Sequence, residues 1–259
     1  MLSDLYAGAS LDALERRERV SLSELETLAL SVAPALSPIN YLFNERQIRV
    51  IAEIKRASPS KGLIAEIENP GELAVSYARG GAGAVSVLTE GRRFLGNLSD
   101  LVEVRSRVEI PVLRKDFIST EYQVLEARAY GADLVLLIAA GLDVSTLSRL
   151  KTFSEELGMS VLLETHNRAE VIIACELESK FIGINARDLE TFDTDRSLFG
   201  ELVGLIPDTS LKIAESAVRG LDDVRDYAEY GADCVLVGEC LLSADAEALV
   251  RSFSAVEKA

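Results

Sequence analysis

The sequence is poor in the residues that build disulfide frameworks and zinc sites. Its 259 residues include three cysteines, Cys175, Cys234 and Cys240, which are too few and too irregularly spaced for either purpose. His166 is the only histidine, and it stands in a polar stretch with no second histidine or cysteine to partner it. We therefore expect His166 to serve the fold and not the chemistry, and we predict a reducing cytoplasm and no bound metal.

Long apolar runs and positive charge are also scarce. No apolar run approaches the roughly 20 residues of a membrane-spanning helix, and residues 1–30 lack the continuous apolar core of a secretory signal. The chain has 42 acidic against 27 basic residues, and a net charge of −15 would repel nucleic acid or an anionic membrane surface. These absences predict a soluble protein, and they leave a small anionic substrate possible.

What the sequence does have is a series of short apolar runs that end in chemically active side chains. Parallel strands deliver their carboxyl ends to one shared face, where barrel enzymes carry their active sites. The six runs that end in a charged or amide residue are IAEIK at 51–55, PVLRKD at 111–116, VLLE at 161–164, IGINAR at 182–187, LKIAES at 211–216 and VLVGE at 235–239. The pattern therefore predicts where the active site lies.

The internal periodicity indicates a (β/α)8 TIM barrel. Residues 77–88, 127–138 and 227–238 share one pattern, in which an alanine-containing helix end is followed by glycine and then by a β-branched apolar run. Expected strands lie near 49–54, 83–88, 110–114, 133–138, 160–164, 181–184, 211–214 and 233–237, about 26 residues apart. An open doubly wound sheet is the alternative, but no G-x-G-x-x-G follows an early strand.

The first 44 residues carry no strand signal. Residues 11–20 and 22–32 have helical patterns, which could cap one end of the barrel. We expect a helical extension over 1–44 packed on a catalytic barrel over 45–259, all within one domain.

Charged strand ends predict a site for acid–base chemistry. Glu53 and Lys55 lie two residues apart on one side of the first strand, while Lys115 ends the third strand and Glu164 the fifth. A lysine and a glutamate that face each other in a dry cavity can divide acid and base work. The alternatives are an ion pair that merely plugs the barrel for Glu53 and Lys55, and a surface pair with Asp116 for Lys115.

Other strand ends offer groups that bind anions. Asn185 and Arg187 follow the sixth strand, and barrels often hold phosphate in the loops after the seventh and eighth strands. Those loops contain Glu215, Ser216, Ala217, Gly238 and Glu239. Basic residues at or just after strand ends could give the acidic protein a positive mouth: Lys55, Arg56, Lys61, Arg114, Lys115 and Arg187.

Seven segments, in unbroken order, resemble the indole-3-glycerol phosphate synthase family of the tryptophan pathway. They are IAEIKRASPSKG (51–62), VLTEGRRFLG (87–96), PVLRKDF (111–117), GADLVLLI (131–138), GINARDL (183–189), IAES (213–216) and GADCVLVGE (231–239). The resemblance implies ring closure of 1-(2-carboxyphenylamino)-1-deoxyribulose 5-phosphate to indole-3-glycerol phosphate, with loss of carbon dioxide and water. It also implies that no cofactor or metal takes part.

The resemblance extends to individual residues. Lys115 looks like the general acid and Glu164 like the base. Lys55 is similar to the lysine that contacts the substrate carboxylate, with Glu53 positioning it. Asn185 and Arg187 match the pair that orients hydroxyl and carboxylate groups. The phosphate cradle would comprise Ser58, Ser216, Gly238 and the backbone of Ala217 and Glu239, with Phe94 and Phe117 around the anthranilate ring, although these two could be plain packing.

Two residues depart from the family pattern, and the milder departure is Asn97, which stands where the family usually has the serine of F-x-G-S. The family usually has Glu-Ser-Gly after the seventh strand, and this chain has Ala217 at the glycine position. If the backbone there has a positive φ, alanine is strained and phosphate is held more loosely.

Three other functions compete with this one. A Schiff-base aldolase could use Lys115 or Lys55 as a nucleophile. A sugar-phosphate isomerase lacks support, since the first and sixth strands do not end in a Cys and Asp pair, and a non-catalytic anion-binding barrel would not need the charged strand ends. We expect a monomer, with possible contacts to other enzymes of the pathway.

Overall fold

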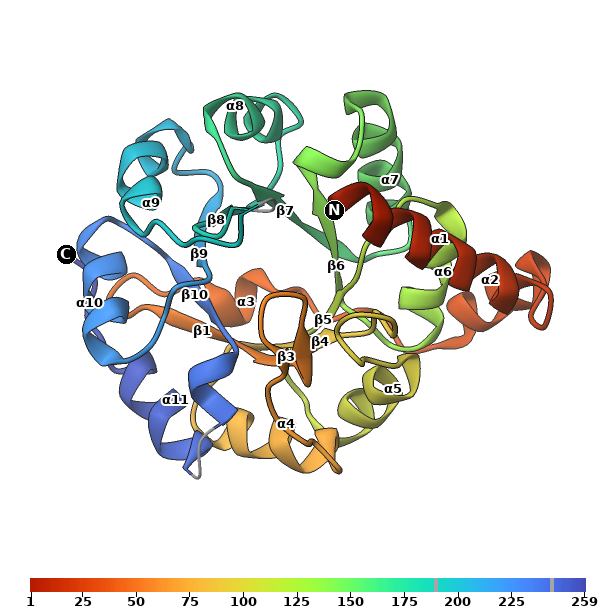
Figure 1. Ribbon diagram of the computed structural model, residues 1–259, viewed down its shortest axis with the longest axis horizontal. Helices are drawn as coiled ribbons and strands as arrows, with labels where there is room; N and C mark the ends of the chain where they lie inside the picture. Colours follow the sequence, from red (N-terminus) through yellow and green to blue (C-terminus); the bar gives the residue numbers. More distant parts are fainter. Residues whose placement is uncertain (189–190, 243–244) are drawn as a thin grey trace.

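Eight parallel strands form a closed barrel in the computed structural model, which describes residues 1–188, 191–242 and 245–259 (Figure 1). Around the barrel the strands follow the order β1-β10-β9-β8-β7-β6-β5-β4. Their bounds are β1 Arg49–Ile54, β4 Ala84–Leu88, β5 Val112–Lys115, β6 Leu134–Ile138, β7 Ser160–Thr165, β8 Phe181–Asn185, β9 Leu211–Glu215 and β10 Cys234–Val237. The predicted (β/α)8 TIM barrel is confirmed.

Helices surround the strands on all sides (Figure 1). They are α4 Pro70–Arg79, α5 Leu98–Arg107, α6 Glu121–Ala129, α7 Val144–Glu156, α8 Arg168–Glu176, α9 Ser197–Leu202, α10 Leu221–Glu229 and α11 Ala246–Ser254, with short 3-10 turns at Ala139–Gly141 (η1), Val203–Leu205 (η2) and Glu239–Leu242 (η3). Between β1 and α4 a small antiparallel hairpin pairs β2 (Ala57–Ser58) with β3 (Gly62–Leu63). Leu189, the last residue of the GINARDL segment, lies outside the described residues.

Local sequence signals begin and end these helices. Thr120 and Gln123 form a capping box at the start of α6, and each side chain satisfies a backbone N–H of the other. After that helix, Gly131 adopts a φ of 89°, which turns the chain into β6 without the penalty that a Cβ would bring. The predicted helix–glycine–strand pattern is confirmed at this unit.

Alternation along the strands separates two hydrophobic layers. Ile51, Leu113 and Leu162 belong to the cluster inside the barrel, whereas Val50, Val112 and Leu163 belong to the cluster between strands and helices. Side chains two residues apart on a strand share a face, so the residues two positions after Ile51, Leu113 and Leu162 also point inward. These residues are Glu53, Lys115 and Glu164, and all three carry charge.

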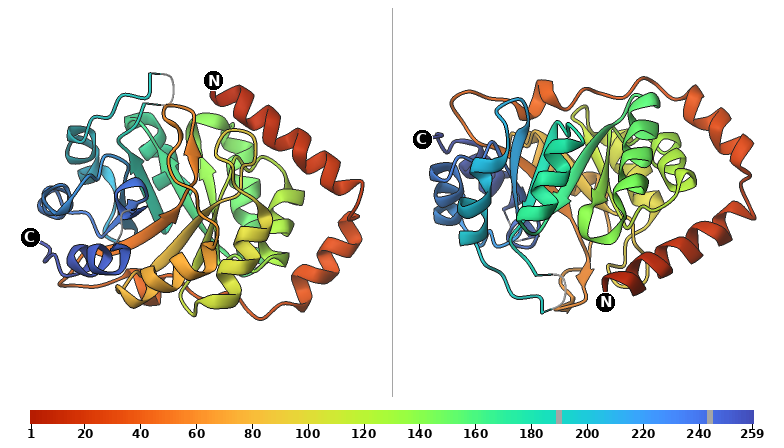
Figure 2. Two further views of the ribbon diagram at one scale, coloured as in Figure 1. Left: turned by 60° about the horizontal axis from the view of Figure 1, so that its bottom comes forward. Right: turned by 90° about the horizontal axis from the view of Figure 1, so that it is seen from above.

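The first 48 residues run along one side of the barrel from one end to the other (Figure 2). Helix α1 spans Leu2–Arg17, α2 Leu22–Ser31 and α3 Ile39–Leu42. The start of α1 lies near the β2–β3 hairpin, while α3 lies at the opposite end, where Leu42 is fully buried and its carbonyl accepts a contact from the Cys234 thiol at 3.4 Å. The expected helices over 11–20 and 22–32 are thus found, but α1 begins nine residues earlier than the pattern indicates.

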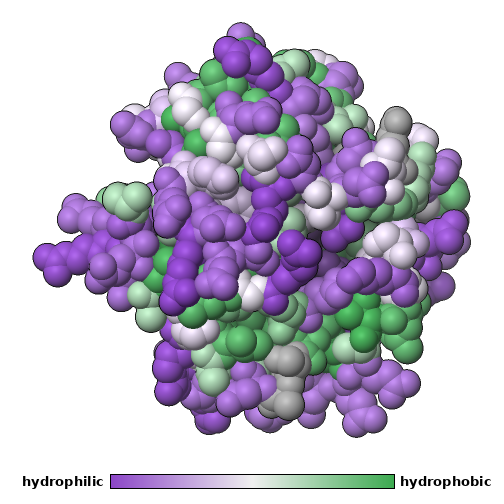
Figure 3. Space-filling view, turned by 60° about the vertical axis from the view of Figure 1, so that its left-hand side comes forward, coloured by the Kyte–Doolittle hydropathy of each residue, from purple (hydrophilic) through white to green (hydrophobic). Residues whose placement is uncertain are grey.

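The outer surface is mixed in character. Figure 3 shows a face covered largely by hydrophilic side chains, with smaller hydrophobic patches between them, as expected for amphipathic helices around a barrel. Across the described ranges, no helix is long and apolar enough to cross a membrane.

Candidate active site

Lys115 lies at the centre of a cluster of inward-facing carboxylates at the carboxyl end of the barrel. Its Nζ is 2.7 Å from Oε2 of Glu215, 3.4 Å from Oε2 of Glu164 and 3.8 Å from Oε2 of Glu53. These three glutamates are almost fully buried, at 1–3% exposed. The site therefore holds three buried carboxyl groups around one ammonium group.

The charges of this cluster shift one another's titration. Burial alone would lower the pKa of Lys115, but the charges of Glu215, Glu164 and Glu53 outweigh it and raise the pKa well above the ordinary range. Burial alone would raise the pKa of Glu164, yet Lys115 and His166 hold it well below its usual value. Lys115 is thus an ammonium and Glu164 a carboxylate at neutral pH.

Glu215 behaves differently from its neighbours. Burial, with the Glu164 charge adding to it, raises the pKa of Glu215 to about 8 although Lys115 opposes the shift. Its Oε1 is buried and has no hydrogen-bond partner among the described residues. Gly183 provides the space for this carboxyl group, because a Cβ there would lie 2.0 Å from Glu215 Oε1. Glu215 is therefore largely protonated at pH 7.

Glu53 and Lys55 form the pair that the sequence predicted. Lys55 Nζ lies 2.6 Å from Oε1 of Glu53, and both side chains come from the end of β1. Burial opposes ionisation of Glu53, but the charges of Lys55 and Lys115 lower its pKa. Gly238, just after β10, leaves room for the carboxylate, since a Cβ there would meet Glu53 Oε1 at 2.6 Å.

Asn185 connects the cluster to the next loops. Its Nδ2 donates to Oε1 of Glu164 at 3.0 Å, and its Oδ1 accepts from the Ser216 hydroxyl at 2.7 Å and from the Arg187 amide at 3.0 Å. The Arg187 guanidinium donates in turn to the Phe192 carbonyl at 3.0 Å. A single amide thus orients the Glu164 carboxylate and a hydroxyl of the loop after β9.

The cluster opens into a cavity of about 580 Å³, within the usual range for small-ligand sites. Of the residues predicted for the site, every one except Glu215 lines this cavity: Glu53, Lys55, Ser58, Phe94, Lys115, Phe117, Glu164, Asn185, Arg187, Ser216, Ala217, Gly238 and Glu239. Glu215 lies beside them, in contact with Lys115. The structure brings together the whole predicted set.

Aromatic rings form one wall of the cavity. The ring centroids of Phe94 and Phe117 are 5.9 Å apart, and Tyr6 of α1 packs edge-on against Phe117 at 5.6 Å. Leu2 and Leu5, also on α1, line the cavity itself. The N-terminal helix therefore covers part of the site. The sequence did not predict this contact, because two leucines near a chain end carry no periodic signal.

The loop after β9 has the strained backbone that the glycine exchange implied. Ser216 and Ala217 both adopt positive φ values, 70° and 59°. A non-glycine residue in this conformation has a cost of about 1–2 kcal/mol. Lys61 of the β2–β3 hairpin reaches the same region and places its Nζ 2.5 Å from Oε1 of Glu239.

The expectation of a positive mouth is only partly right. Lys55, Lys61, Lys115 and Arg187 line the cavity, whereas Arg56 and Arg114 do not. Arg56 pairs with Asp100 on α5, and Arg114 is fully buried on the outer side of β5. The alternation of the strand, which turns Lys115 inward, turns its neighbour outward.

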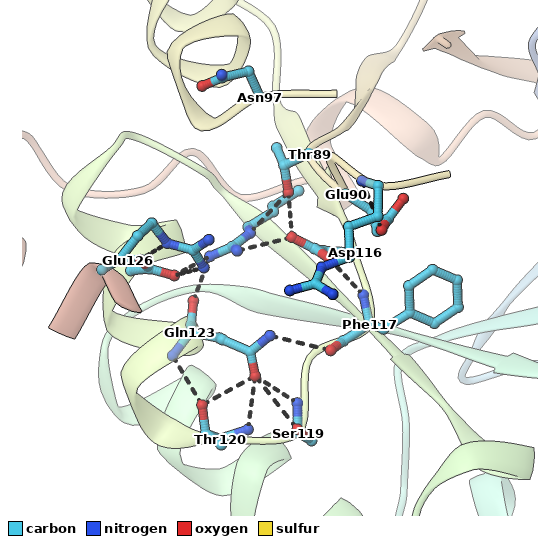
Figure 4. A network of polar contacts seen from close by, with 12 residues as sticks. Thr89, Glu90, Asn97, Asp116, Phe117, Ser119, Thr120, Gln123 and Glu126 are labelled. Atoms are coloured by element: carbon cyan, nitrogen blue, oxygen red, sulfur yellow. Dashed lines mark hydrogen bonds and ion pairs between the residues drawn. The ribbon is translucent and has the colours of Figure 1, made fainter. Parts of the chain in front are cut away.

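A buried polar network holds the end of β5 from outside (Figure 4). Asp116 accepts hydrogen bonds from Thr89 Oγ1 at 2.6 Å, Arg114 at 2.9 Å and the Phe117 amide at 2.8 Å. Gln123 accepts from the Ser119 and Thr120 amides and donates to the Phe117 carbonyl at 3.1 Å. Asp116 is thus no surface partner of Lys115, because it fixes the turn that carries Lys115 and Phe117.

His166, which we expect to serve the fold, lies beside a predicted site residue. Its Nε2 lies 3.2 Å from Oε1 of Glu164, and its Nδ1 lies 3.2 Å from Oε2 of Glu170. The sequence pattern missed these contacts because the partners of His166 are carboxylates, whereas a metal site would need histidine or cysteine partners. Among the residues that the structure describes, no group of His, Cys, Asp and Glu side chains is arranged to hold a metal ion.

This fold and site define a barrel enzyme whose acid–base groups meet at the carboxyl ends of its strands. A family model described as indole-3-glycerol phosphate synthase matches residues 2–253. The chain therefore belongs to the indole-3-glycerol phosphate synthase family, whose members are carboxy-lyases of tryptophan biosynthesis.

Individual relatives agree with this assignment. The indole-3-glycerol phosphate synthase of Paenarthrobacter aurescens (strain TC1) is 52% identical over 247 residues, covering 94% of this chain and 91% of the relative. That of Leifsonia xyli subsp. xyli (strain CTCB07) is 49% identical over 256 residues, covering 99% and 98%. Among solved structures, 3-hexulose-6-phosphate synthase from Salmonella typhimurium aligns with a TM-score of 0.63 over 80% of this chain and 97% of that chain, and its 16% identity supports the fold alone.

Proposed function

We propose that this chain closes the indole ring of 1-(2-carboxyphenylamino)-1-deoxyribulose 5-phosphate, releasing carbon dioxide and water and giving indole-3-glycerol phosphate. The observation that carries the proposal is the placement of Lys115 Nζ 3.4 Å from the Glu164 carboxylate in one cavity. A proton donor and a proton acceptor held this close can serve successive steps of one reaction without a cofactor.

In this proposal Lys115 is the general acid. The carbon–carbon bond forms when the aromatic carbon attacks the ribulose carbonyl, and the carbonyl oxygen then needs a proton. The ammonium of Lys115, whose pKa is raised by three carboxylates, is charged and able to stabilise the developing alkoxide. Glu164, ionised and oriented by Asn185, accepts the proton in the steps that expel water and restore the aromatic system.

Other residues bind and orient the substrate. Lys55 contacts the carboxylate that leaves as carbon dioxide, and Glu53 positions the lysine at 2.6 Å. Asn185 and Arg187 orient hydroxyl and carboxylate groups, while Phe94 and Phe117 hold the anthranilate ring. The phosphate is bound by Ser58, Ser216, Gly238 and the backbone of Ala217 and Glu239. The backbone of Glu239 serves here because its carboxylate would repel phosphate and is paired with Lys61.

The same geometry disfavours a Schiff-base aldolase. A lysine nucleophile must lose its proton to attack a carbonyl. The three glutamates around Lys115 stabilise the ammonium form and so oppose that loss. We further propose that the protein is a cytoplasmic monomer made of a helical extension (1–44) on a catalytic barrel (45–259).

The test is a fluorescence assay of indole formation from the anthranilate-linked ribulose phosphate. Lys115→Met and Glu164→Gln should each lower kcat by about 10²–10⁴-fold or more, because each removes one acid–base group. Lys151→Met, which removes an exposed pair with Glu155 on α7, should keep wild-type activity. Wild-type rates in either active-site variant would refute the proposal, and a borohydride-trapped adduct with a sugar phosphate would support the aldolase instead.

A further inference from the structure

His166 is placed where it contacts the proposed base without being part of the cavity wall. It follows β7 directly, two residues after Glu164, and its side chain is 10% exposed. The ring lies between two carboxylates, with Nε2 3.2 Å from Oε1 of Glu164 and Nδ1 3.2 Å from Oε2 of Glu170. The contact with Glu164 is an ion-pair contact without the alignment of a hydrogen bond.

The start of helix α8 fixes the ring in this place. Glu170 Oε2 accepts a hydrogen bond from the His166 backbone amide at 2.8 Å, and Glu170 Oε1 accepts from Asn167 Nδ2 at 2.5 Å. Asn167 in turn caps the helix through the Glu170 amide. Because Glu170 grips both the backbone and the ring of His166, the imidazole has little freedom to turn away from Glu164.

We propose that His166 is a positioning residue for the reaction: its imidazolium, held by Glu170, keeps the Glu164 carboxylate ionised and directed toward Lys115. This inference rests on the proposed role of Glu164 as base. Opposite charges on both sides of the ring favour the protonated imidazole, and an imidazolium in turn favours the ionised form of Glu164.

The surroundings of the pair support this direction. Burial lowers the pKa of His166, but its contacts with the Glu164 and Glu170 carboxylates outweigh burial and raise the pKa to about 10. The 3-10 turn η1, which packs on β7 and α8, contributes no titratable group. The titratable or polar groups that face Glu164 from the other elements are Lys115 on β5, Asn185 on β8, Glu215 on β9, Glu53 on β1 and Tyr6 on α1.

Because the chain has a single histidine, its titration can be followed directly. In tag-free protein labelled with ¹³C-histidine, the one imidazole signal of the wild type should remain in the charged form up to pH 8. In Glu164→Gln and in Glu170→Gln the apparent pKa of His166 should fall by about one unit or more, because each variant removes a charge within about 3 Å. A wild-type pKa near the ordinary 6.5, or no change in Glu164→Gln, would overturn the inference.

The second measurement is the pH profile of indole formation. His166→Gln should move the acid limb of kcat/KM upward by about one pH unit, since Glu164 loses a charge that favours its ionised form, and should lower kcat about tenfold with KM nearly unchanged. The control is Asp143→Ala, which removes the N-cap of α7 away from the site. This variant should lower stability alone and leave the acid limb in place. An acid limb in His166→Gln that coincides with the wild-type limb would overturn the inference.

The two measurements separate this inference from the proposed function. If the wild type forms no indole product, the proposed function fails, whereas the titration of His166 still tests the contact with Glu164. If the wild type is active and His166→Gln does not fold, the two glutamine variants of the carboxylates decide the question.

Discussion

Arg114 and Lys115 are neighbours on β5, yet each lies in a different buried ionic cluster. The inner cluster surrounds Lys115 with three carboxylates and opens to the cavity. The outer cluster surrounds the Arg114 guanidinium with Asp116 at 2.9 Å, Glu126 at 3.3 Å and the Gln123 carbonyl at 2.7 Å. A second arginine, Arg16 of α1, reaches Glu126 with two further hydrogen bonds, at 2.5 and 2.8 Å.

The difference between the clusters lies in how completely partners compensate each buried carboxyl group. In the outer cluster, two guanidinium groups face two carboxylates, and hydroxyl, amide and backbone groups complete the hydrogen bonds. In the inner cluster, Glu215 contacts one cation, Lys115, and among the described residues its buried Oε1 has no hydrogen-bond partner. A compensated buried cluster specifies structure, whereas an uncompensated one shifts pKa values and is typical of active sites.

The largest expected effect comes from breaking the compensated cluster. Arg114→Met should lower the free energy of unfolding by about 3–5 kcal/mol, because it leaves the Asp116 and Glu126 carboxylates buried without their shared cation. Urea denaturation followed by circular dichroism measures this loss. Lys115→Met is the matched control on the same strand, and we expect it to lose activity but retain most of its stability. Lys55 still partners Glu53, His166 and Asn185 still partner Glu164, and Glu215 is largely protonated at pH 7. Equal stability of Arg114→Met and wild type would remove the distinction.

A smaller effect is expected from neutralising the uncompensated carboxyl group. The folded-state pKa of Glu215 is about 8, above its usual 4.5, so its contribution to stability is complete below pH 4.5 and is lost as the pH rises toward 8. Glu215→Gln should therefore gain stability relative to the wild type across this window, and the gain should be larger at pH 8 than at pH 5. Urea titrations at pH 5, 6.5 and 8 test this, with Glu121→Gln as an exposed control. A constant difference at all three pH values would show that Glu215 is ionised throughout.

The smallest effect concerns backbone strain beside the inner cluster. Ala217→Gly should raise the free energy of unfolding by about 1 kcal/mol or less, because glycine adopts a φ of 59° without the Cβ penalty but has a more flexible unfolded chain. Ala7→Gly, on the exposed side of α1, should have the opposite sign, with a loss of up to about 1 kcal/mol. Thermal unfolding of both variants measures the contrast, and a loss of stability in Ala217→Gly would show that the loop is not strained.

The sequence predicted most of the barrel and the cavity residues because both depend on local patterns. Each strand is a short apolar run. Because side chains alternate along a strand, Glu53 shares the inward face of Ile51, and Glu164 shares that of Leu162. The start of α1 was missed because its buried positions include small residues, Gly8 and Ala9, which give little hydrophobic periodicity.

Contacts across the fold were beyond the reach of local patterns. Nothing in the residues around Asp116 shows that its partners include Thr89, which follows β4 and lies 27 residues away in the sequence. The contact of His166 with Glu164 also depends on the conformation of the turn after β7, which Glu170 fixes from inside the next helix. Pairings of this kind follow from tertiary structure, and a single sequence records them only as isolated polar residues.

Barrel closure sets the order in which the site can be assembled during synthesis. Arg49 on β1 is in register with Cys234 on β10, so residues 185 positions apart in the sequence pair to complete the ring. Until β10 has been made, β1 exposes an unpaired edge, and Glu53 lacks the Gly238 backbone beside it. A growing chain thus carries a catalytic strand that cannot yet function, and its most sequence-distant strand pairing forms last.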